Sequence, residues 1–169
     1  MIHIRNAREG EADLLSEIGL RAWQKAMAAM GETDAQLDAA RSAFSNFTHN
    51  SWLTITVAEL NGQIVGWGAR ERFDETISDF WIDPAFTRQG VGAALLAQIE
   101  TDIADQGFSS AGMQTHSGNA EAINFFQKHG YAIHWLSIVY NPKLDRDVPS
   151  VGLTKPLESA GDGTYGPDF

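Results

Sequence analysis

Gly90 and Gly92 stand one residue apart, directly after an apolar run, and open a segment with helical periodicity. The first amides of a helix have no partner within the helix, and the helix dipole places partial positive charge on them. Glycine leaves these N–H groups uncovered, so a phosphate can approach the backbone. The predicted anion site also includes the amides of Gln89, Val91 and Ala93 and the positive charge of Arg88.

Two common phosphate-binding motifs do not fit this segment. A Walker loop needs four residues between its glycines, followed by Lys and then Ser or Thr, and neither feature is present. A dinucleotide fingerprint needs Gly or Ala three residues after the second glycine, where this chain has Leu95. Taken alone, the segment therefore fits a phosphate site and the glycine-rich start of an ordinary helix about equally well.

A second segment favours the phosphate site. It begins at Asn119, ends at Tyr131 and reads Asn-Ala-Glu-Ala-Ile-Asn-Phe-Phe-Gln-Lys-His-Gly-Tyr. Together the two segments resemble the GNAT superfamily of acyl-CoA-dependent N-acetyltransferases. Its motifs run Gln/Arg-x-x-Gly-x-Gly/Ala and Asn-x-x-Ala-x-x-Phe-Tyr-x-x-x-Gly-Phe. The resemblance implies transfer of an acetyl group from acetyl-CoA to a primary amine of a small molecule or, as second choice, of a protein.

The resemblance also implies how the coenzyme is held. The Gly90 segment would bind the pyrophosphate, and Trp81 and Ile82 would offer main-chain hydrogen bonds to the pantetheine arm. Asn119 would contact the coenzyme besides capping a helix. Phe126 is an expected coenzyme contact that departs from the family, where a tyrosine often protonates the departing thiolate. Phenylalanine has no hydroxyl, so that role does not carry over.

The residues leave the general base open, because an attacking amine must lose a proton and two side chains could take it. Asp79 lies in the strand before the glycines, and His116 ends the next predicted strand with an ordinary pKa near ~6.5. Each also has a plain structural interpretation, as a solvent-facing strand residue and a loop histidine. The histidines show no metal-ligand spacing. A non-catalytic acyl-CoA-binding or regulatory domain therefore stays open as the alternative.

Composition limits the function classes. With 169 residues and 43% hydrophobic residues, the chain suits one domain, and it has no cysteine for disulfides or covalent catalysis. A net charge of −10 argues against nucleic acid and is consistent with attraction of a cationic amine or with solubility alone. No membrane span or signal peptide is evident, so we expect a cytoplasmic protein. A homodimer remains open.

Hydrophobic periodicity predicts the elements that must position these residues. Helices are expected over 11–30, 34–47, 90–106 and 119–129, and strands over 2–5, 52–60, 63–73, 77–82, 109–115, 131–140 and 151–157. The fold class is α/β (α+β). With the resemblance, it becomes a GNAT-like mixed, mostly antiparallel sheet of six to seven strands, splayed between the fourth and fifth and flanked by four helices. We expect a single domain over 1–157 and a tail over 158–169.

Overall fold

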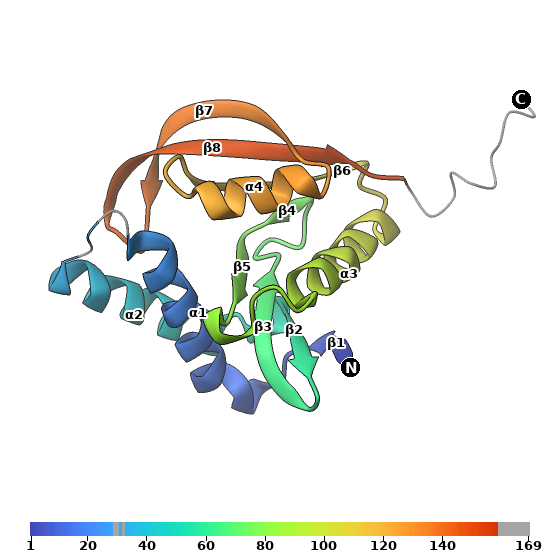
Figure 1. Cartoon of the computed structure of the whole chain (residues 1–169), viewed down its shortest axis with the longest axis horizontal. Helices are drawn as coiled ribbons and strands as arrows, with labels where there is room; N and C mark the ends of the chain where they lie inside the picture. The colour runs from blue at the N-terminus through green and yellow to red at the C-terminus, as the bar shows by residue number, and fades with distance from the viewer. Residues whose placement is uncertain (29–30, 32, 159–169) are drawn as a thin grey trace, which may run out of the picture.

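The computed structural model describes residues 1–28, 31 and 33–158 (Figure 1). Residues 29–30, at the predicted end of the first helix, and 159–169, nearly all of the predicted tail, lie outside this description. Within the described part the fold is α+β, with four α-helices and eight strands in two sheets. Both the predicted fold class and the predicted splay of the sheet are confirmed.

The first sheet is antiparallel throughout. Its order is β1 (Ile2–Asn6), β2 (Ile55–Leu60), β3 (Gln63–Ala69) and β5 (Asp79–Ile82). Asn61 and Gly62 form the predicted two-residue hairpin between β2 and β3, and both have positive φ, 53° and 85°. Such a turn requires left-handed backbone at both central positions, which Asn and Gly adopt at least cost.

The second sheet has the order β4 (Thr76–Ile77), β6 (Ser110–His116), β8 (Arg146–Pro156) and β7 (Ala132–Asn141). Its β4–β6 pair is parallel, and the others are antiparallel. The single strand predicted over 77–82 is in fact two, because the Ser78 amide and hydroxyl both bond to the Ala69 carbonyl oxygen. This bend places β4 in one sheet and β5 in the other, so the sheets separate between β5 and β6.

Helices cover both faces of the first sheet. Helices α1 (Ala12–Met27) and α2 (Asp34–Asn50) bury Leu15, Ile18 and Phe44 against Trp67 on one face. Helix α3 (Val91–Asp105) packs on the opposite face, and α4 (Ala120–Lys128) joins the same apolar cluster through Phe126. Short 3-10 turns lie at η1 (Glu9–Glu11), η3 (Trp52–Thr54) and η4 (Pro84–Phe86).

Several predicted boundaries shift. The second strand begins at Ile55 rather than 52, because η3 takes up its first residues, and the third ends at Ala69 rather than 73. The last strand is longer than predicted: it starts at Arg146, since Asn141 pairs with Arg146 and closes a hairpin with β7. Figure 1 shows β7 and β8 passing over α4. Among the described helices, none combines the length and apolar composition needed to cross a bilayer.

Candidate active site

The start of α3 has the backbone geometry of the predicted anion site. Gly90 is its N-cap, with φ +82° and no side chain to cap the helix, and the Gly90 carbonyl accepts the first helical bond from the Ala94 amide at 3.1 Å. The amides of the three residues between them therefore have no helical partner. Arg88, also at positive φ, precedes the turn. This backbone presents uncapped N–H groups and one guanidinium to an anion.

These residues border a cleft of about 950 Å³ that follows the gap between the two sheets. Of the predicted anion-site residues, Arg88, Gly90, Gly92 and Ala93 line it, whereas Val91 turns its side chain into the core and the Gln89 side chain is exposed. Apolar walls come from β5, β6 and α4, and further positive charge comes from Lys25 and Lys128. An anionic ligand with an apolar arm fits this combination.

The free edge of β5 forms one wall of the cleft. The Asp83 amide donates to the Val65 carbonyl of β3 at 2.8 Å. Successive residues of an antiparallel strand turn their main-chain groups to opposite edges, so Trp81 also faces β3, while Phe80 and Ile82 face the cleft. The main-chain groups of Phe80 and Ile82 are therefore free at the cleft edge, whereas those of Trp81, predicted as a main-chain contact, face β3, and its indole lines the cleft.

Asn119 lies where the cleft turns from β6 into α4. Its Oδ1 accepts from the Ala122 amide at 3.2 Å, which is the predicted N-cap, and its Nδ2 donates to Thr115 Oγ1 at 3.1 Å. The hydroxyl proton of Thr115 is therefore directed away from Asn119.

Phe126, about two turns further along α4, is 2% exposed although it borders the cleft. Its ring packs edge-on against Phe80, Phe125 and Tyr131, with centroids 5.4, 5.2 and 5.1 Å away. The position therefore serves mainly as core packing.

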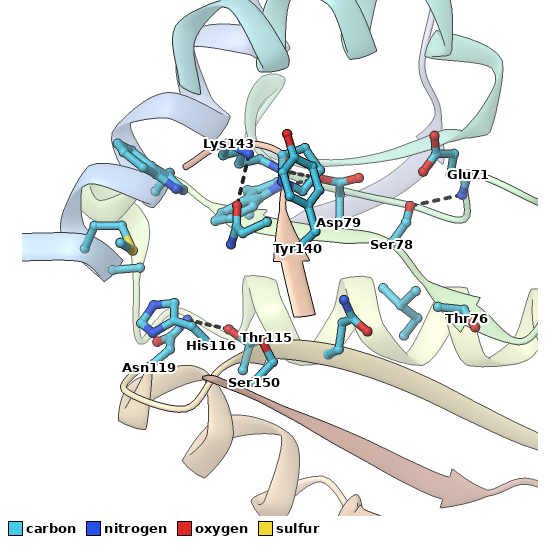
Figure 2. A pocket seen from close by; sticks show the side chains of 18 of the residues that line it. Glu71, Thr76, Ser78, Asp79, Thr115, His116, Asn119, Tyr140, Lys143 and Ser150 are labelled. Atoms are coloured by element: carbon cyan, nitrogen blue, oxygen red, sulfur yellow. Dashed lines mark hydrogen bonds and ion pairs between the residues drawn. The ribbon is translucent and has the colours of Figure 1, made fainter. Parts of the chain in front are cut away.

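A second cavity of about 510 Å³ opens from the same gap (Figure 2). Its walls come from α1, the β3–β4 loop, the end of β6 and the β7–β8 hairpin. The cavity and the cleft share Ala26, Ile77, Ser78, Asp79, Trp81, Gln114, Thr115 and Asn119. The two spaces therefore meet at the bend between β4 and β5, where a group bound in one can reach a group bound in the other.

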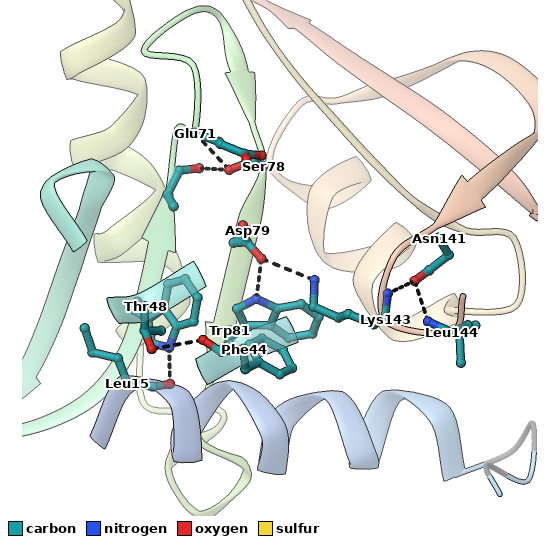
Figure 3. Close-up of polar contacts among 12 residues, drawn as sticks. Leu15, Phe44, Thr48, Glu71, Ser78, Asp79, Trp81, Asn141, Lys143 and Leu144 are labelled. Carbon is teal, nitrogen blue, oxygen red and sulfur yellow. Dashed lines mark hydrogen bonds and ion pairs between the residues drawn. The ribbon is translucent and has the colours of Figure 1, made fainter. Parts of the chain in front are cut away.

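Asp79 stands at this junction and is 9% exposed. Its Oδ1 accepts from Trp81 Nε1 at 3.1 Å and lies 3.6 Å from the ammonium of Lys143 (Figure 3). Among the described residues both contacts use Oδ1, which leaves the second oxygen for another cation. A carboxylate so placed can attract an ammonium ion and accept a proton from it.

His116 lies at the far wall of the second cavity and is 7% exposed. Neither ring nitrogen has a hydrogen-bond partner among the described residues. Burial lowers the pKa of His116 below its ordinary value, because removal from water disfavours the imidazolium. The ring is therefore neutral near pH 7 and has a lone pair available for a proton. Asp79 and His116, the two alternative candidates for the base, thus border one cavity.

Comparison with known proteins identifies the family to which the chain belongs. Residues 18–131 match the model of the acetyltransferase (GNAT) family. The chain belongs to this family. It is an acetyl-CoA-dependent GNAT acetyltransferase. The match ends at Tyr131 and so spans both sequence motifs. No curated protein sequence gives a significant match.

Solved structures share the fold of this GNAT acetyltransferase. A GCN5-related N-acetyltransferase from Rhodopseudomonas palustris superposes with a TM-score of 0.77 at 20% identity, covering 92% of this chain and 95% of that one. The PaiA N-acetyltransferase from Thermoplasma acidophilum, solved with coenzyme A, gives 0.77 at 15% identity, covering 93% and 99%. The ribosomal-protein-S18-alanine N-acetyltransferase from Escherichia coli gives 0.69 at 18% identity, covering 100% and 99%.

Sequence patterns do not place several residues of the candidate site of this GNAT acetyltransferase. Glu71, Arg72 and Asp74 of the β3–β4 loop line the second cavity, as do Tyr140 and Lys143 of the β7–β8 hairpin. A hydrogen bond to Asp145 raises the pKa of the Tyr140 hydroxyl, which favours its protonated form. The Asn-Pro sequence at 141–142 signals a turn, but no sequence signal states which cavity the turn borders. Over the described residues, no three His, Cys, Asp or Glu side chains gather as a metal site.

Proposed function

We propose that this acetyltransferase transfers the acetyl group of acetyl-CoA to a primary amine of a small molecule, by direct attack in a ternary complex. The observation that carries the proposal is the meeting of two spaces at Asp79. One has an anion site and an apolar wall that suit a coenzyme, and the other has carboxylates that suit an ammonium ion. A protein amine is the second choice, because the cavity of about 510 Å³ holds a small acceptor entirely.

The coenzyme lies along the cleft in this proposal. Its pyrophosphate accepts hydrogen bonds from the free amides that begin at Gly90, with Arg88 beside it. Its pantetheine arm pairs with the main-chain groups of Phe80 and Ile82, in the manner of an added strand. Asn119 and Phe126 border the arm near its thiol end. One amide of the β5 edge then polarises the thioester carbonyl, which stabilises the oxyanion that forms there.

The acceptor enters the second cavity as an ammonium ion, drawn by Asp79 and Glu71. It loses one proton to Asp79 or to His116, the two candidate bases. The neutral nitrogen then attacks the thioester carbon, and the bond from carbon to sulfur breaks. The thiolate departs without a positioned acid, because the pKa of a thiol, about 8.5, makes it a tolerable leaving group. The product amide and the free coenzyme result.

A screen of primary amines for release of free thiol from acetyl-CoA tests the proposal. We expect release to depend on the amine, the product to carry one acetyl group on nitrogen, and turnover to rise with pH as a proton leaves the ammonium or the base. Asp79→Asn and His116→Ala identify the base: the true base loses turnover while coenzyme affinity is kept. Coenzyme binding without thiol release for any amine would instead favour the non-catalytic acyl-CoA-binding domain.

A further inference from the structure

The second cavity, which we call the acceptor cavity, already contains a primary ammonium group, that of Lys143. Its Nζ lies 3.6 Å from Asp79 Oδ1, and its side chain is 21% exposed. The contact is longer than a hydrogen bond. The nitrogen also lies over two aromatic rings, with centroids at 4.9 Å for Phe44 and 5.5 Å for Trp81. A carboxylate and two ring faces together form a site for an alkylammonium ion.

The backbone that carries Lys143 is fixed, whereas its side chain is long. Leu144, the next residue, is 4% exposed and belongs to the core beneath α1 and α2. Asn141 Oδ1 accepts from the amides of both Lys143 and Leu144, at 3.0 and 3.2 Å, and so closes the turn (Figure 3). The turn therefore holds the Lys143 stem at the cavity wall, and four rotatable bonds let the ammonium move within the cavity.

The other lysines of the sequence are Lys25, Lys128 and Lys155, and none lines the acceptor cavity. Lys155 is held by both oxygens of Glu100, at 3.0 and 3.2 Å. Lys25 is 47% exposed in its side chain and lies 3.8 Å from Glu121 at the coenzyme cleft. Lys128 is exposed on α4. Lys143 thus differs from all three, because it stands beside Asp79, a residue that the cavity shares with the coenzyme cleft.

We propose that Lys143 is a self-acetylation site: with acetyl-CoA bound and no amine present, its side-chain nitrogen takes the acetyl group. The inference rests on the proposed function, since the coenzyme must lie in the cleft with its thioester at the junction. Self-acetylation removes the cation that faces Asp79 and so changes the charge that an arriving acceptor meets.

The step balances as an acyl transfer. Lys143 Nζ gives one proton to the Asp79 carboxylate, which later releases it to solvent. The nitrogen lone pair forms a bond to the thioester carbon, and the bond from carbon to sulfur breaks, with its electron pair leaving on the thiolate. The thiolate takes the second proton from the nitrogen. The products are a neutral acetyl-lysine amide, free coenzyme thiol and one proton. No oxidant, reductant or metal takes part.

Intact mass spectrometry and peptide mapping after incubation with acetyl-CoA alone test this step. We expect one acetyl group per chain, on Lys143, with a rate constant that does not change with protein concentration. We expect Lys143 to react at least about tenfold faster than Lys25, Lys128 or Lys155, because positioning beside the thioester accelerates attack. Asp79→Asn slows the reaction at Lys143 alone.

Two variants separate this reaction from chemical acetylation in solution. Lys143→Arg keeps the charge beside Asp79 but offers no nucleophilic amine, so it yields no acetylated chain beyond the background at the other lysines. Gly92→Glu blocks the anion site and lowers the rate at Lys143 to that background. Acetylation that is no faster at Lys143 than at the other lysines, or that is unchanged in Gly92→Glu, would overturn the proposal.

The proposed function is judged independently of this result. Lys143→Arg with added amine shows whether thiol is still released catalytically. Catalytic release in Lys143→Arg, together with no acetylation of Lys143 in the wild type, would leave the proposed function standing and refute self-acetylation. A single acetyl group on Lys143, with no turnover for any amine, would support self-acetylation and count against transfer to a free amine.

Discussion

Gly92 lies against Phe125 in the lining of the coenzyme cleft, so closely that a β-carbon at position 92 would be 3.2 Å from Cε1 of that ring. A side chain there meets the ring on one side and the proposed phosphate site on the other. We predict that Gly92→Glu abolishes the stabilisation by acetyl-CoA. In the wild type, acetyl-CoA at about 100 times its Kd should raise the free energy of unfolding by ~2.7 kcal/mol. For a protein of this size, that corresponds to an increase in Tm of roughly 5–11 °C.

Calorimetry with and without acetyl-CoA measures this shift, and the comparison within each variant removes any loss of intrinsic stability from crowding at Phe125. Gly10→Glu is the matched control, because a β-carbon at Gly10 would meet nothing within 4 Å and Gly10 does not line the cleft. Gly10→Glu adds the same charge and should keep the full increase in Tm on addition of acetyl-CoA. A full shift in Gly92→Glu would refute the placement of the pyrophosphate.

Phe126→Tyr restores the hydroxyl that many family members carry, yet we predict little gain in turnover. Because the ring is enclosed by Phe80, Phe125 and Tyr131, the new hydroxyl is buried without a designed partner. We expect the free energy of unfolding to fall by about 1–3 kcal/mol and kcat to change by less than about tenfold.

Denaturant unfolding and steady-state kinetics measure the two effects of Phe126→Tyr. Phe73→Tyr is the control, since Phe73 is 52% exposed and its added hydroxyl reaches water. A gain in kcat of about a hundredfold would show instead that thiolate departure limits the wild type.

The buried ring of His116 predicts a loss of stability in acid. Burial lowers the pKa of His116 in the folded state. As the pH falls toward and below the ordinary pKa of about 6.5, the unfolded chain therefore binds more protons than the folded chain. Stability therefore falls with the pH through that range until the folded state also takes up its proton. We expect the wild-type Tm to decrease between about pH 7.5 and 5.5, and His116→Gln to weaken that decrease.

His134→Gln is the control for this experiment, because His134 is exposed on β7. It should leave the pH dependence of Tm as in the wild type. An unchanged slope in His116→Gln would mean that the ring is solvated or paired in solution and is not poised as a neutral base.

Electrostatic attraction of a cationic acceptor predicts a salt-dependent KM. Glu71 lines the acceptor cavity, and the chain carries a net charge of −10. Raising the salt from low to moderate concentration should raise KM for an ammonium substrate, because screening weakens the attraction. Glu71→Gln should raise KM at low salt and reduce its dependence on salt. Glu9→Gln is the control: it removes the same charge at a position that does not line the cavity, and it should change neither KM at low salt nor the salt dependence of KM. Equal effects of Glu71→Gln and Glu9→Gln would show that only the net charge of the protein matters.

Local sequence patterns predict most of the elements and the residues that gather along the coenzyme cleft. The turn at Asn61–Gly62, the helix that starts beyond Gly90 and the cap at Asn119 all follow from backbone preferences that a few adjacent residues express. Each of these features is encoded within a short stretch of chain, so the residues themselves are sufficient to indicate it.

The acceptor cavity could not be predicted from local sequence patterns, because its walls come from segments that are distant in sequence. Lys143 faces Asp79 from a hairpin 64 positions away, and His116 reaches the same cavity from a third strand. The bend at Ser78 was missed because its cause is a pair of bonds to Ala69 on another strand. The register of β5, which turns the main-chain groups of Phe80 rather than those of Trp81 toward the cleft, is likewise set by its partner strand.

Initial-rate kinetics with acetyl-CoA and a primary amine both varied test most directly whether the two spaces that meet at Asp79 bind both substrates at once. We predict thiol release that requires the amine and double-reciprocal lines that intersect, as attack within a ternary complex demands. Parallel lines, or release that is independent of the amine, would contradict the account.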